Sequence, residues 1–247
     1  MSDDKFKFPT EMVELPSKGL VYDKDNPLSS GKIEMKYMTA KEEDILTNQN
    51  YINKGTVIDE LLKSLIVSEI NYNDLIVGDK NAIMVAARIL GYGKDYSFTY
   101  NGEEHTVDLS QLDNKKIDTE HFSNGKNEFN FQLPTSGTLL TYKLLTHGDD
   151  KKIDAEVKGL KKLNKNASPE LSTRLKFMIT AVDGDSEKMT VRNFVDNYFL
   201  ARDSRAFREH IKQTQPDVNL TFEYEGPDGD VKDVDIPIGL TFFWPDL

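Results

Sequence analysis

The chain has 247 residues, of which 38% are hydrophobic and 30% charged, and its formal net charge is −11. This length suffices for one large domain or two ordinary ones, and the hydrophobic fraction argues against wholesale disorder. The acidic balance disfavours nucleic-acid binding, which needs clustered Lys and Arg, and the lack of cysteine excludes disulfides, thiolate catalysis and cysteine-ligated zinc.

The beginning of the sequence and its apolar runs bear on where the protein is made. Residues 1–6 contain no basic region followed by an apolar stretch, so we expect no signal peptide. No run approaches the roughly 18 apolar residues of a membrane span. We therefore expect a soluble, acidic protein that is made inside the cell and does not enter a membrane.

The first half opens on a proline–glycine turn followed by a strand. Leu15-Pro16-Ser17-Lys18-Gly19 combines a proline, which fixes φ, with a glycine, which permits a positive φ. Between residues 32 and 38, the apolar Ile33, Met35 and Tyr37 alternate with charged side chains. This alternation predicts a strand with one buried face.

Three helices are expected after this strand. Thr39 followed by Glu42 has the pattern of a capping box and predicts a short helix from about Ala40 to Thr47. Thr56 and Asp79 are predicted to cap two further helices with apolar stripes. The second of these should end where glycines follow it, at residues 91–93.

The same order of elements returns in the second half. Leu133-Pro134-Thr135-Ser136-Gly137 repeats the Leu-Pro-x-x-Gly pattern, and a strand-like run follows it. A lysine-rich helix over 149–163, a helix opened by Pro169, an amphipathic helix over 190–200 and a helix beginning at Asp203 are predicted next.

Each half then ends in a predicted β-hairpin. Asn101-Gly102 between alternating runs is the strongest short-range hairpin signal, and residues 222–236 repeat the pattern with a longer turn. We therefore predict an α+β fold of two related tandem α+β modules, a degenerate internal duplication in which each module has a strand pair, helices and a β-hairpin. The predicted domains are residues 1–124 and 125–247.

The sequence offers no recognisable reaction centre. Its four histidines do not lie at metal-ligand spacing, no Gly-x-Ser-x-Gly elbow exists, and Gly91-Tyr92-Gly93-Lys94 follows a helix where a phosphate loop would precede one. The aspartates at 228–235 lack EF-hand spacing. We therefore assign no catalytic, cofactor-binding or metal-binding residue and expect no cofactor. A hydrolase with an unrecognised carboxylate site is the alternative, and it predicts a pocket with perturbed carboxylate pKa values.

Candidate partner-binding residues lie near both ends and on one helix. Aromatic residues are typical interface anchors, although packing against the protein's own core explains terminal aromatics equally well. Lys41, Glu42 and Glu43 lie in the first turn of a predicted helix, where simple solvation is the preferred explanation. The terminal candidates are Phe6, Phe8, Phe242, Phe243 and Trp244.

Four stretches of the first half are distinctive when taken together: residues 14–22, 26–28, 36–46 and 79–93. They resemble the baseplate hub and hub-assembly proteins of T-even-type contractile-tailed bacteriophages. The resemblance covers about residues 11 to 110, while the second half is similar only in size and layout. In that family the following hairpin often carries cysteines, whereas residues 100–105 here contain none.

The resemblance implies a non-enzymatic protein of the host cytoplasm that helps to build the baseplate hub during virion morphogenesis. Its partners would be other hub and tail proteins, with no role for nucleic acid or membrane. A permanent place in the virion baseplate, a transient chaperone role and a homo-oligomer all remain open.

Overall fold

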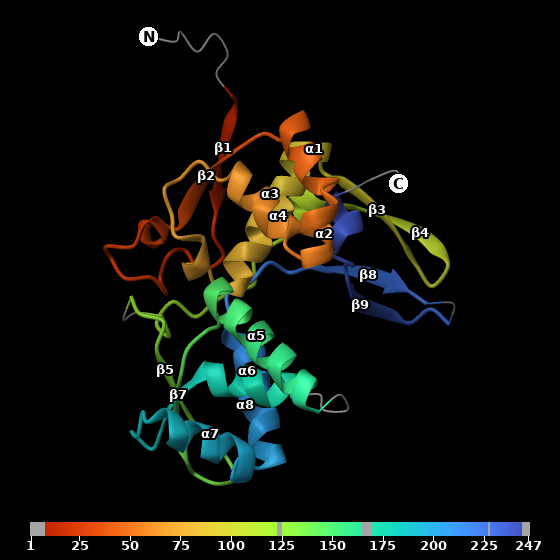
Figure 1. Cartoon of the computed structure of the whole chain (residues 1–247). Coiled ribbons are helices and arrows are strands. Elements are labelled where there is room, and N and C mark those ends of the chain that lie inside the picture. The colour runs from red at the N-terminus through yellow and green to blue at the C-terminus, as the bar shows by residue number, and fades with distance from the viewer. Residues whose placement is uncertain (1–7, 123–124, 165–168, 227, 244–247) are drawn as a thin grey trace, which may run out of the picture.

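The computed structural model describes residues 8–122, 125–164, 169–226 and 228–243 and has a mixed α+β fold (Figure 1). The first repeat contains β1 (Thr10–Glu14), β2 (Lys32–Lys36), α1 (Ala40–Leu46), α2 (Gln49–Lys54), α3 (Val57–Leu65), α4 (Val77–Tyr92), β3 (Asp95–Tyr100) and β4 (Glu103–Asp108). β1 pairs antiparallel with β2, and β3 with β4. None of the described helices is both long and apolar enough to span a bilayer.

The second repeat follows the same plan with one extra strand. It contains β5 (Phe129–Gln132), β6 (Leu139–Tyr142), α5 (His147–Leu163), α6 (Glu170–Met178), β7 (Ile179–Val182), α7 (Lys188–Asn197), α8 (Ala201–Thr214), β8 (Thr221–Glu225) and β9 (Val231–Asp235). The first three strands form a sheet in the order β5-β6-β7, and β8 pairs with β9. The predicted α+β class, strand pairs, helices and hairpins are confirmed.

The Leu-Pro-x-x-Gly loops are held in the same way in both repeats. In the first, Asp79 on α4 accepts hydrogen bonds from the Ser17 amide at 2.9 Å and from the Ser17 and Tyr22 hydroxyls, each at 2.6 Å. In the second, Asp203 on α8 accepts from the amides of Thr135 and Ser136 at 2.8 and 3.0 Å. Each aspartate is the third residue of its helix, so the prediction that Asp79 caps α4 is wrong: its carboxylate binds a distant loop.

A second shared contact joins the end of a strand to the start of a helix. Lys36 lies 2.8 Å from Glu42 in the first repeat, and Lys143 lies 2.7 Å from Asp149 in the second. Each carboxylate also completes a capping box, with Thr39 and Thr146 respectively. The same residue types thus fasten the strand to the helix twice.

The two hairpins pack against each other although they belong to different repeats. The ring centroids of Phe98 and Phe222 lie 5.0 Å apart, and those of Tyr100 and Tyr224 lie 4.9 Å apart. Figure 1 shows β8 and β9 beside the elements of the first repeat, away from α5 to α8. Buried apolar residues from Leu15 to Phe243 form one continuous cluster, so the predicted boundary near residue 124 does not separate two independent cores.

Candidate functional site

The aromatic residues at the carboxyl end of the described chain belong to the core. Phe242 and Phe243 are fully buried, and the Phe242 ring meets Tyr96 of β3 edge to face with 4.8 Å between centroids. The prediction that these two residues face a partner is therefore wrong, because they fill the space behind the first hairpin. Phe6 and Trp244 lie outside the described residues.

The candidates on α1 divide into exposed and buried side chains. Lys41 and Glu43 are exposed, as expected. Glu42 is fully buried, so the prediction that it binds a partner is wrong. Its carboxylate accepts hydrogen bonds from Ser64 at 2.7 Å and from Lys36 at 2.8 Å. Burial raises its pKa, but the bonds from Lys36, Thr39 and Ser64 outweigh burial and lower the pKa to about 2.

Two apolar side chains at the start of the described chain are exposed to solvent. Met12 of β1 is 59% exposed, and Phe8, two residues before the strand begins, is 62% exposed. The ammonium group of Lys36 lies 5.6 Å from the centre of the Phe8 ring. Met12 was not predicted from the sequence as a partner-binding residue, and residues 8–12 show no regular alternation that would have indicated it.

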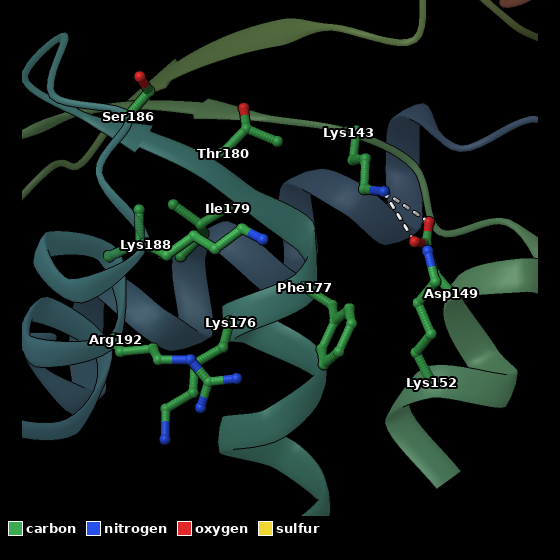
Figure 2. A pocket seen from close by; sticks show the side chains of 11 residues that line it. Lys143, Asp149, Lys152, Lys176, Phe177, Ile179, Thr180, Ser186, Lys188 and Arg192 are labelled. Carbon is green, nitrogen blue, oxygen red and sulfur yellow. Dashed lines mark hydrogen bonds and ion pairs between the residues drawn. The ribbon is translucent and has the colours of Figure 1, made fainter. Parts of the chain in front are cut away.

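The second repeat holds a cavity of about 460 Å³ between α5, α6, β7 and α7. Figure 2 shows the side chains that line it, among them the apolar Phe177 and Ile179. Val191 is the third apolar residue of the lining. Around these apolar residues stand five cationic side chains in a protein whose overall charge is −11. They are Lys143, Lys152, Lys176, Lys188 and Arg192.

Three of these cations are paired with carboxylates. Lys143 binds both oxygens of Asp149 at 2.8 and 2.7 Å, Lys176 lies 2.6 Å from Asp196, and Arg192 donates two hydrogen bonds to Glu156. Lys152 and Lys188 form no ion pair within the described part of the chain. The lining thus contains five cations and one carboxylate, Asp149, and the three ion pairs leave Lys152 and Lys188 as its two unpaired cations.

The most strongly perturbed histidine lies between the two repeats. His147, at the start of α5, is buried, with its Nδ1 3.3 Å from Lys80 Nζ and its Nε2 3.5 Å from Asp59 Oδ2. Lys80 also lies 2.6 Å from Asp59, and Tyr72 donates to the same carboxylate. These groups bind one another and connect α5 of the second repeat to the first repeat, so we interpret them as a structural network.

Among the described residues, no group of three or more His, Asp or Glu side chains is arranged so that it could hold a metal ion. Two regions are candidates for contact with a partner or ligand: the exposed Phe8 and Met12 at β1, and the basic cavity. Comparison with known proteins gives no analogue for either, because no family model, no curated protein and no solved structure matches the chain.

Proposed function

We propose that the protein is a non-enzymatic phage tail baseplate hub protein or hub-assembly factor that acts by binding other hub and tail proteins. The resemblance of residues 11–110 motivates this proposal. The observation that carries it is the exposure of two apolar side chains, Met12 on β1 and Phe8 just before it. β1 pairs with β2 along one edge and with no other described strand.

The geometry of β1 suits the addition of a strand from a partner. An extended segment can use the free backbone groups of an edge strand, while its side chains cover the exposed apolar residues. Acidic and basic side chains surround those residues: Glu34 faces Met12 across the sheet, and Lys36 lies next to Phe8. Such alternating charge favours selectivity of pairing over affinity.

The buried carboxylates support a non-enzymatic role over the hydrolase alternative. Glu42, Asp79, Asp149 and Asp203 are all buried, and each fastens a loop or strand to the start of a helix. Carboxylates with such partners stabilise the fold. A hydrolytic site would need them to converge on a substrate-sized opening with free acid and base functions.

A double variant, Phe8→Ser with Met12→Ser, is expected to reduce copurification of hub and tail proteins from infected cells by about tenfold or more, because two exposed anchors of an interface contribute on the order of 1 kcal/mol each. Quantitative mass spectrometry of the pulled-down proteins measures this loss. Leu163→Ser is the matched control, since Leu163 is 87% exposed but lies in the second repeat. Unchanged capture, or an equal loss in the control, would contradict a role for β1.

Proteomics of purified virions tests the two versions of the proposal. A permanent hub component is expected in mature particles at a fixed ratio to other hub proteins. An assembly factor is expected in infected-cell extracts and absent from mature particles.

A further inference from the structure

The two repeats differ at one position beside the shared lysine–carboxylate pair. Ile66 forms a bridge to Met35 of β2, and Ile179 pairs in the same way with Tyr142 of β6. Two residues before these isoleucines stand Ser64 in the first repeat and Phe177 in the second. Ser64 and Phe177 therefore occupy equivalent places.

This difference changes how the buried carboxylate of each repeat is bonded. The Ser64 hydroxyl donates to Glu42 at 2.7 Å, which completes the bonding of that buried carboxylate. Phe177 has no group that could donate to Asp149, and the cavity lies beside it. Figure 2 shows the Phe177 ring between Asp149 and Lys152 on one side and Lys176 and Arg192 on the other.

We propose that this cavity binds a small phosphorylated molecule that carries a flat apolar group. A phosphate monoester is close to a dianion at neutral pH, which suits a cavity lined by two lysines that have no ion pair in the described residues. Lysines bind phosphate as point charges, and Lys152 on α5 and Lys188 on α7 approach from different elements without an ion pair in the described residues.

The remaining lining suits the other part of such a ligand. Phe177 offers a ring for stacking, and Ile179 and Val191 supply apolar contact. Thr180 also lines the cavity. A volume of about 460 Å³ lies within the range of small-molecule pockets.

Isothermal titration calorimetry with phenyl phosphate tests the proposal in the full chain. We expect saturable binding with a Kd of about 1 mM or tighter at low ionic strength, weakened by salt because the charged groups are partly exposed. Lys152→Gln with Lys188→Gln is expected to weaken it by at least about tenfold. The control, Lys24→Gln with Lys54→Gln, changes two exposed lysines of the first repeat by the same amount of charge and should bind like the wild type.

Two further ligands and one further variant separate the contribution of the phosphate charge to binding from that of stacking on the Phe177 ring. Inorganic phosphate should bind more weakly than phenyl phosphate, and benzyl alcohol should not bind. Phe177→Leu should remove the advantage of phenyl phosphate over inorganic phosphate. Absence of saturable binding, or an equal loss in the control variant, overturns the proposal. So does binding of an Asp/Glu-rich peptide in place of phenyl phosphate, which would identify an acidic protein segment as the occupant.

This inference does not rest on the proposed hub function. The cavity lies in the second repeat and its test uses the isolated protein, whereas the hub proposal is tested through β1 in infected cells. Either can fail while the other holds.

Discussion

Replacing Asp79 by alanine is expected to lower the free energy of unfolding by about 3–5 kcal/mol, because each buried donor left without an acceptor costs about 1–3 kcal/mol. Asp79 is fully buried and accepts bonds from the Ser17 amide, the Ser17 hydroxyl and the Tyr22 hydroxyl. Alanine would leave all three donors without this acceptor in a site closed to water. Urea unfolding followed by circular dichroism measures the loss.

Two further variants test the physical cause of this loss. Burial raises the pKa of Asp79 more than its hydrogen bonds lower it, so the site favours a neutral side chain over a charged one. Asparagine is neutral and has nearly the same shape as aspartate. Asp79→Asn should therefore destabilise the protein less than Asp79→Ala. Asp203→Ala in the second repeat should also cost less. Asp203 accepts from the backbone of Thr135 and Ser136, which are exposed and can bind water instead. Equal losses at both aspartates would contradict this explanation.

The elements that local chemistry determines were predictable from the sequence. Thr39 and Glu42 form the predicted capping box, and α1 runs from Ala40 to Leu46. Asn101 and Gly102 adopt φ values of 51° and 86°, the left-handed conformation that a two-residue hairpin turn requires. The repeated Leu-Pro-x-x-Gly pattern predicted two similar loops for the same reason, because proline and glycine impose their geometry locally.

Features that depend on distant partners were not predictable. Asp79 has the sequence context of a helix cap, yet it binds a loop 62 residues earlier. Glu42 has the polarity of a solvated first turn, but Lys36 and Ser64 enclose it. Phe242 and Phe243 are aromatic residues near the end of the chain, and only the position of β3 explains why they are buried.

The basic cavity has no local signature in the sequence. Its cations come from the end of β6, from α5, from α6 and from α7, and the lysines of α5 alone are typical of a solvated helix. The one sequence signal is the comparison of Ser64 with Phe177, and this comparison requires the alignment of the repeats that the strand pairing provides.

Acid is expected to weaken the protein through His147 before most carboxylates are protonated. Burial, and after it the positive charge of the nearby Lys80, lower the pKa of His147 from 6.5 to about 4, although Asp59 acts in the opposite direction. Because the unfolded chain takes up a proton near pH 6.5 and the folded chain does not, the stability is complete above pH 6.5 and falls between about 6.5 and about 4. The expected loss is about 2–3 kcal/mol, measured by urea unfolding at a series of pH values.

Substitution separates this histidine from other acid-sensitive groups. His147→Gln cannot titrate and should flatten the pH dependence in that interval, whereas His105→Gln, in the first hairpin, should retain it. Lowered carboxylate pKa values, such as that of Glu42, act at lower pH, since that group loses its stabilising charge between about 4.5 and about 2.

The position of Lys80 helps to explain why His147 stays neutral. Replacing Lys80 is therefore the most direct test of the lowered pKa of His147. A lysine ammonium can only donate, so Nδ1 of His147 must accept, and the ring proton lies on Nε2 towards Asp59. Lys80→Met removes that donor and a neighbouring positive charge, so we expect the pKa of His147 to rise and the acid sensitivity above pH 4 to decrease. NMR titration of the imidazole measures the pKa directly. An unchanged pKa in Lys80→Met would mean that burial alone keeps the ring neutral and that the contact across the two repeats has no electrostatic role.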